Sequence, residues 1–178
     1  MSELFSIQLQ NRQQQGRDGV WLDLPTTTEQ VQAALRQIGI SSDNPQGLFI
    51  SGYFAEEEKR FAIPYNMVLA SNVDELNFLA SRLETLSTGE RAELNAALQA
   101  PQSELFSIGR ITDFPENVDY YVHLPDVHGP AQLGDYYLNR SGMVDMPDEW
   151  KGGIDTAQFG RYVAQQEQGA FTQYGYLV

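Results

Sequence analysis

The sequence predicts an α+β protein with short strands toward both ends of the chain and helices in the middle. Three observations support this fold class: apolar and polar residues alternate near the N-terminus, apolar residues recur at helical intervals in the middle, and aromatic residues gather in the last third. The periodicity changes near residues 60 and 101. We therefore expect an elongated molecule of three small subdomains in a row, over residues 1–60, 61–101 and 102–178.

The first subdomain, residues 1–60, is expected to be a ββαβ unit. Residues 3–9 alternate as a strand, and residues 20–24 form a second strand that a proline ends. The segment 26–29 has the spacing of a capping box, and apolar residues then repeat at helical intervals over 31–38. Residues 48–54 complete the unit as a third strand.

The middle subdomain, residues 61–101, carries two predicted helices. Residues 72–75 (Asn-Val-Asp-Glu) and 87–90 (Ser-Thr-Gly-Glu) both place a polar capping residue three positions before a glutamate. Apolar residues follow each of them at helical spacing, and Pro101 ends the second helix. Acids in the first turns of these helices also complement the helix dipole.

The last subdomain, residues 102–178, is expected to be a second α+β unit. Residues 118–124 predict a strand, 130–140 and about 154–165 predict helices, and 170–178 predict a closing strand. Its many tyrosines and phenylalanines either pack the core or form a surface for self-association, because tyrosine-rich surfaces favour protein contacts. The candidates for such a homodimer interface are Tyr136, Tyr137, Phe159 and Tyr162.

Negative charge is concentrated between residues 41 and 155. This stretch holds nineteen of the 24 acidic residues and seven of the 11 basic ones, a net charge of −12 out of −13 for the chain. A folded surface this negative repels nucleic acid and anionic membranes and attracts basic surfaces. We therefore expect a basic protein partner, no nucleic acid and no membrane. The candidate binding residues are Glu56, Glu57, Glu58, Asp74, Glu75, Glu84, Glu90, Glu93, Asp113, Glu116, Asp119, Asp126, Asp135, Asp145, Asp148 and Glu149.

Several functional classes lack the residues they need. The chain has no cysteine, which removes disulfides, thiolate zinc sites and a cysteine nucleophile. It has no nucleophile-elbow serine motif and no phosphate-binding loop. The start shows no signal-peptide pattern, and no apolar stretch is long enough to span a bilayer. These features predict a soluble, cytoplasmic protein that is not an enzyme and needs no cofactor.

One histidine segment keeps a catalytic alternative open. His123, Asp126 and His128 lie within six residues, a spacing that can hold a metal through two imidazoles and a carboxylate. Pro125 and Gly129 instead indicate a surface turn, where such residues are common. We interpret the segment as a turn, and the alternative is a metal-dependent enzyme.

The chain resembles the ArdA antirestriction family over most of its length. The most specific part is Ala131-x-x-x-x-Tyr136-Tyr137-Leu138-x-x-x-Gly142, followed by Ile154-Asp155-x-x-x-Phe159-Gly160-Arg161. The first is similar to the family's helix with two tyrosines, and the second to its Ile-Asp-x-x-x-aromatic-Gly-Arg signature. The order of the predicted strands and helices is similar as well.

The resemblance implies a non-catalytic DNA mimic encoded on mobile genetic elements. Such proteins are elongated, dimerise through the C-terminal domain and occupy the DNA-binding channel of type I restriction–modification enzymes, chiefly at the methyltransferase core. The residues allow such mimicry, because carboxylates at i and i+3 of a helix lie about as far apart as phosphates along a strand. Asp145, Asp148 and Glu149 form such a row if helical, and Glu90 and Glu93 a shorter one. An acidic module that inhibits another DNA-binding protein remains the alternative.

Overall fold

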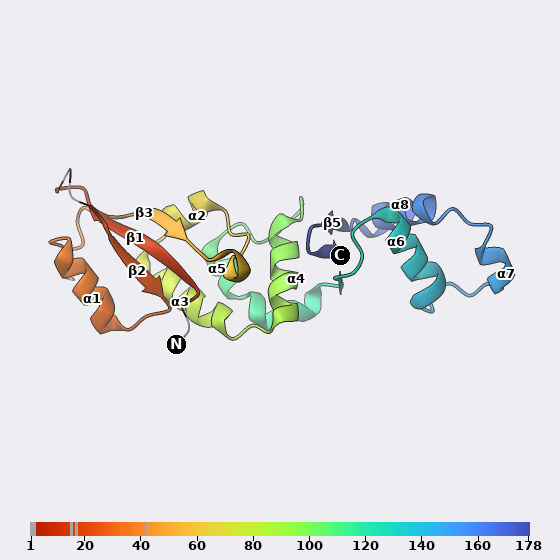
Figure 1. Cartoon of the computed structure of the whole chain (residues 1–178), viewed down its shortest axis with the longest axis horizontal. Coiled ribbons are helices and arrows are strands. Elements are labelled where there is room, and N and C mark those ends of the chain that lie inside the picture. The colour runs from red at the N-terminus through yellow and green to blue at the C-terminus, as the bar shows by residue number, and fades with distance from the viewer. Residues whose placement is uncertain (1–2, 15, 17, 42) are drawn as a thin grey trace. The chain divides into compact units, whose positions relative to one another are not determined.

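The computed structural model describes residues 3–14, 16, 18–41 and 43–178 (Figure 1). It confirms the α+β class: two small antiparallel sheets lie in the N-terminal and C-terminal parts of the chain, with helices between them in sequence. No helix in the described ranges is long and apolar enough to cross a membrane.

The chain forms two compact units, and each unit is made of two separate stretches of the sequence. The N-terminal unit contains the residues up to Ser87 together with Glu104–Pro115, and the C-terminal unit contains Thr88–Ser103 and Glu116–Val178. The division into three subdomains in a row stays a prediction.

The N-terminal unit is built on a sheet in the order β2-β1-β3, in which both pairs are antiparallel. Phe5, Ile7 and Leu9 of the central strand are buried, and the residues between them point to the opposite face of the sheet. The elements of this unit are β1 (Phe5–Asn11), β2 (Val20–Leu24), α1 (Thr28–Gln37), β3 (Leu48–Phe54), the 3₁₀ turn η1 (Glu57–Lys59), α2 (Tyr65–Leu69), α3 (Val73–Glu84) and α5 (Ile108–Thr112); the 3₁₀ turn η2 (Phe114–Glu116) follows.

Local capping signals explain where the helices of this unit begin. The Asn72 side chain accepts a hydrogen bond of 2.9 Å from the Glu75 backbone N–H, as the sequence predicted. The capping box of α1 is one residue later than predicted, because Thr27 is the capping residue and Gln30 is its reciprocal partner. The short helices α2 and α5 were not predicted, since five residues carry too little periodicity to be recognised.

The C-terminal unit contains a second sheet, in the order β4-β6-β5. Helix α4 packs against β6, and α6 packs closely against α8. The elements of this unit are α4 (Thr88–Gln99), the 3₁₀ turn η3 (Val118–Tyr120), β4 (His123–Leu124), α6 (Pro130–Asp135), the π-helical turn η4 (Tyr136–Arg140), α7 (Asp148–Lys151), α8 (Thr156–Glu167), β5 (Ala170–Thr172) and β6 (Gly175–Leu177).

Two of the strand predictions for this unit need correction. Residues 118–124 begin as a 3₁₀ turn, and only His123–Leu124 is a strand. The closing segment is a hairpin of two short strands, with Gln173 and Tyr174 in the turn and Gly175 as the first residue after it. Gly175 has a φ of +118°, and a side chain at this position would collide with the Leu124 carbonyl oxygen. A tight hairpin therefore takes the place of the single strand predicted over residues 170–178.

Candidate functional site

Most of the predicted acidic residues are exposed in their units. Glu84, Glu90, Glu93 and Asp135 are half-buried, and the remaining twelve are exposed: Glu56, Glu57, Glu58, Asp74, Glu75, Asp113, Glu116, Asp119, Asp126, Asp145, Asp148 and Glu149. Both units therefore carry acidic side chains that a partner can reach.

Some of these acids have a local structural role. Asp74 and Glu75 lie in the first turn of α3, where carboxylates stabilise the positive end of the helix dipole. Glu75 also accepts a hydrogen bond of 2.6 Å from the Ser71 hydroxyl. Asp148 forms an ion pair of 2.9 Å with Lys151, and Glu56 forms one of 3.1 Å with Lys59.

Three consecutive acids lie at the start of η1. Glu56, Glu57 and Glu58 line a shallow hollow of about 480 Å³ on the N-terminal unit. They are consecutive in sequence, so this grouping follows directly from the charge run.

The proposed helical row of Asp145, Asp148 and Glu149 does not form. Helix α7 is a single turn that begins at Asp148, and Asp145 lies in the preceding irregular segment. The sequence around it, with Pro147 before and Gly152 and Gly153 after, limits this helix to one turn. The shorter row is present, since Glu90 and Glu93 both belong to α4.

Glu93 differs from the other acids because its side chain is partly withdrawn from water. No described residue donates a hydrogen bond to its buried Oε1 atom. Burial, and after it the nearby charges of Glu90 and Asp119, together raise the pKa of this carboxyl to about 7. This carboxyl therefore changes its charge near neutral pH.

We expect Glu93→Gln to stabilise the protein above pH 7 and to change little at pH 5. The pKa of Glu93 is higher in the folded chain than its usual 4.5, so its contribution favours folding below pH 4.5 and is lost as pH rises through about 7. Glutamine stays neutral at every pH, so Glu93→Gln should raise the free energy of unfolding by about 1–2 kcal/mol at pH 8. Urea unfolding at pH 5 and pH 8 measures this change in the free energy of unfolding. Glu149→Gln, at an exposed site, is the control, and an equal response of both variants would contradict the assignment.

Two tyrosines of the C-terminal unit bind the same carboxylate. Glu167 ends α8, and its Oε1 accepts a hydrogen bond from the Tyr137 hydroxyl. Its Oε2 accepts a second one, of 2.9 Å, from the Tyr176 hydroxyl. Tyr176 is fully buried in a cluster with Val127 and Leu133. Burial first, and then Glu167, raise the pKa of both tyrosines above the usual value, so the phenols stay neutral donors.

This arrangement was missed from the sequence. Glu167 is the one acid after residue 155, which is the signal that could have singled it out. Its partners are 30 and nine residues away, and only the fold brings them together.

Two glycines allow α6 and α8 to approach each other at backbone distance. A Cβ atom at Gly160 would lie 1.8 Å from the Pro130 carbonyl oxygen, and one at Gly134 would lie 1.9 Å from the Thr156 carbonyl oxygen. Asp155 caps α8 by accepting a hydrogen bond of 2.9 Å from the Gln158 backbone N–H. The segment from Ile154 to Arg161 therefore has a structural explanation: its aspartate starts the helix and its glycine permits the crossing.

Comparison with known proteins decides the family. The family described as "Antirestriction protein (ArdA)" matches residues 15–178. The chain belongs to the ArdA family. This membership makes it an antirestriction protein, which inhibits type I restriction–modification enzymes without being an enzyme itself. No match was found among the curated proteins.

The residues that carried the resemblance to ArdA are mostly structural here. Tyr136 packs edge-on against Tyr137, with ring centroids 5.5 Å apart, and the Arg140 guanidinium lies 5.7 Å from the Tyr136 ring centroid. Phe159 is half-buried, whereas Tyr162 is 60% exposed on α8. Of the four candidates for a dimer interface, Tyr162 is the most accessible.

In this ArdA protein, the histidine segment is held by a contact with the protein backbone. The Nε2 atom of His123 lies 2.7 Å from the Tyr174 carbonyl oxygen, and His128 and Asp126 are exposed. Within the part of the chain that the structure describes, no three His, Asp or Glu side chains are grouped closely enough to hold a metal ion.

We expect the double variant His123→Ala with His128→Ala to retain its inhibition of type I restriction. Its only loss should be about 1 kcal/mol of stability, because His123 no longer contacts Tyr174. The measurements are the cleavage of unmodified DNA by a type I enzyme and the metal content of the purified wild-type protein. Stoichiometric metal, or lost inhibition in a folded double variant, would restore the metal-site alternative.

Proposed function

We propose that this ArdA protein inhibits type I restriction–modification enzymes as a DNA mimic, whose carboxylates occupy the positions of phosphates in the DNA-binding channel. The observation that carries the proposal is a set of exposed acids without neutralising partners. Among the described residues, no ion pair is formed by Glu57, Glu58, Asp74, Asp119, Asp126, Asp145 or Glu149.

Exposed charges of one sign lower the stability of the fold, so a role in binding explains them better than a role in stability. Mutual repulsion of carboxylates destabilises a compact fold, and interspersed lysines would relieve it. The chain carries only 11 basic residues against 24 acidic ones. A channel that binds duplex DNA is positively charged, since DNA has one charge about every 1.7 Å along its axis. An acidic surface complements such a channel and is steered toward it.

Because the partner acts on DNA inside the cell, we place the protein in the cytoplasm.

Competition with DNA tests this proposal. The purified protein and a duplex that contains the recognition site should displace each other from a type I methyltransferase core. The affinity of the protein should fall as salt rises, with a slope that differs from that of DNA, because a protein lacks the condensed counterions of the duplex. Simultaneous binding of protein and duplex would exclude a shared channel.

We further propose a homodimer formed through the C-terminal unit. Most soluble oligomers are symmetric dimers with one self-complementary patch, and the exposed Tyr162 on α8 is suited to such a patch. Deleting residues 102–178 is a poor test, because this deletion removes α5 from the N-terminal unit. A surface substitution is preferable.

We expect Tyr162→Glu to shift the protein from dimer to monomer in light scattering. A buried glutamate at a two-fold contact faces its own copy, so repulsion adds to the lost aromatic contact. Tyr65→Glu is a matched control, since Tyr65 is 48% exposed on the N-terminal unit. If only the control variant dissociates, the contact lies on the N-terminal unit.

A further inference from the structure

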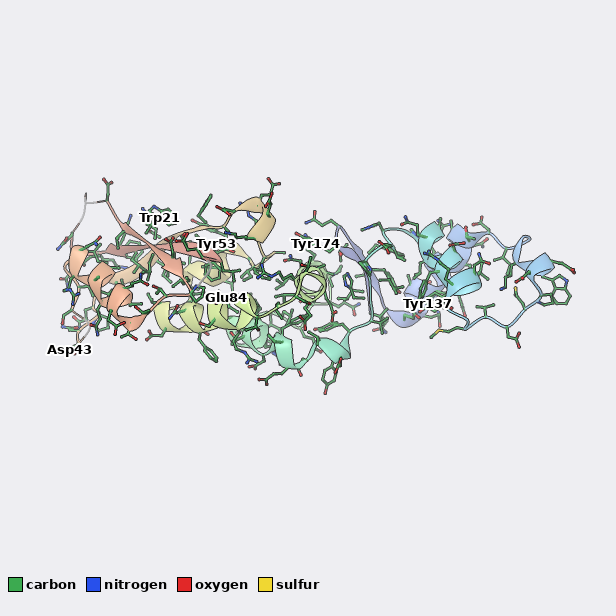
Figure 2. All side chains as sticks on the ribbon, turned by 60° about the horizontal axis from the view of Figure 1, so that its bottom comes forward. Trp21, Asp43, Tyr53, Glu84, Tyr137 and Tyr174 are labelled. Carbon is green, nitrogen blue, oxygen red and sulfur yellow. The ribbon has the colours of Figure 1, made fainter. Side chains whose placement is uncertain are left out.

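The outer face of the N-terminal sheet is open to solvent and carries aromatic residues. Ser6, Gln8 and Gln10 of β1 point to this face, because the residues that alternate with them are buried. On the neighbouring strands, Trp21 of β2 is 50% exposed and Phe54 of β3 is 55% exposed. Figure 2 shows Trp21 on the side of the sheet away from α1 and α3.

The Trp21 indole lies across the sheet. Trp21, Gln8 and Gly52 are paired in one row over the three strands. A Cβ atom at Gly52 would lie only 3.0 Å from the Cη2 atom of the indole and 3.1 Å from the Cβ atom of Gln8. The ring therefore reaches from β2 over β1 to β3 and occupies the space that a side chain at Gly52 would take. The Trp21 side chain is half exposed, so part of the indole stays open to solvent.

The adjacent row supplies an oriented carboxylate. Asp23, Ser6 and Phe54 are paired across the same three strands. The Ser6 hydroxyl donates a hydrogen bond of 2.6 Å to Asp23 Oδ1, which holds the carboxylate toward the middle of the sheet. No described Lys or Arg forms an ion pair with Asp23. Residues two apart on a strand are about 7 Å from each other, so the carboxylate and the indole are neighbours on this face.

An aromatic plane beside a fixed carboxylate has the chemistry of a guanidinium site. Arginine stacks on aromatic faces and binds carboxylates with its planar fork, whereas lysine offers a compact point charge. The same sheet face already accommodates one such stack: the Arg12 guanidinium lies 5.2 Å from the ring centroid of Phe49, which pairs with Gln10. A net charge of −13 disfavours a nucleic-acid base as the occupant of the site.

We propose that the Trp21–Asp23 platform, formed by Trp21, Asp23, Ser6 and Gly52, docks an arginine side chain of the partner enzyme. This inference rests on the proposed function, because a protein surface that binds phosphates presents arginines to any mimic of DNA. The platform then recognises its partner side chain by direction as well as by charge, whereas the dispersed carboxylates contribute only charge.

Substitutions on the platform test the proposal in the full-length protein. Trp21→Ala and Asp23→Asn should each lower the affinity for the type I methyltransferase core about tenfold, whereas Trp21→Phe should retain most of it. Gly52→Val keeps the tryptophan but fills its space, so it should act like Trp21→Ala. Phe78→Ala, which removes a 60% exposed aromatic residue from α3 of the same unit, should bind like the wild type.

A small-molecule probe tests the guanidinium chemistry directly. In the variant Trp150→Phe, Trp21 is the one remaining tryptophan and its fluorescence reports on the platform. Arginine amide should change this fluorescence more than lysine amide at equal concentration, and Asp23→Asn should remove the difference. Equal responses to both amides would overturn the assignment.

The outcomes separate this inference from the proposed function. If the wild-type protein does not compete with duplex DNA, the DNA-mimic proposal fails. If the wild type competes and both Trp21→Ala and Gly52→Val bind as tightly, the platform alone is refuted. Circular dichroism and thermal unfolding confirm that each variant is folded before its affinity is compared.

Discussion

Neutralising Glu57, Asp119, Asp145 and Glu149 together is expected to lower the affinity for the type I enzyme about a thousandfold at physiological salt. These acids are exposed, and no described residue forms an ion pair with them, so replacement by Gln or Asn removes charge without breaking such a pair. If each contributes about 1 kcal/mol, the four sites together amount to about three tenfold steps. A titration of the methyltransferase core measures the change.

A matched variant separates local mimicry from overall charge. Replacing Glu3, Asp18, Glu29 and Asp43 also removes four negative charges, and these exposed acids lie outside the proposed surface. We expect this variant to lose much less affinity. Equal losses would mean that the enzyme responds to net charge, and an undiminished affinity of the first variant would mean that it does not read these carboxylates.

Gly160→Ala is expected to destabilise the C-terminal unit by about 3 kcal/mol or more. The added methyl group would lie 1.8 Å from the Pro130 carbonyl oxygen and 2.8 Å from the Gly134 backbone nitrogen. Both are backbone atoms, so α6 and α8 must separate before the methyl group fits. That separation also disturbs the cluster in which Tyr137 and Tyr176 bind Glu167.

Gly89→Ala provides the control for this substitution. Gly89 lies in the first turn of α4, in the same unit, and a Cβ atom there has no neighbour within 4 Å. Alanine should stabilise this helix slightly, by about 0.5–1 kcal/mol. Urea unfolding followed by circular dichroism compares the two variants. If both variants change the free energy of unfolding by less than about 1 kcal/mol, the α6–α8 crossing accommodates a methyl group, which would contradict this prediction.

The secondary structure was largely predictable because its signals are local. The capping pattern at Asn72 and the apolar spacing of α3 depend on residues three or four apart. The strand predicted at residues 118–124 was mostly wrong for the same reason: only its last residues find partners, His123–Leu124 in β6 and Val122 in Val178, more than 50 residues away. Strand pairing depends on distant neighbours that a local pattern does not contain.

The candidate site was only partly predictable. The positions of the acidic residues in the sequence located the charge, and Glu57, Asp145 and Glu149 are exposed in the structure. Which of the acids face a partner stays a prediction. The half-burial of Glu93 and its pKa of about 7 could not be foreseen, since they depend on what packs around α4 and on Asp119 of a separate turn. Helical spacing also did not reveal that α7 stops after one turn.

The sequence by itself determined the α+β class, the acidic character and the family, because composition, short-range periodicity and motif order are properties of the linear chain. The tertiary structure alone decided which side chains act together. Glu167 joins Tyr137 and Tyr176, Gly160 meets Pro130, and the Trp21 indole covers Gly52. Each of these contacts depends on the packing of separate elements, and packing is fixed by the shapes of side chains that only the fold makes neighbours.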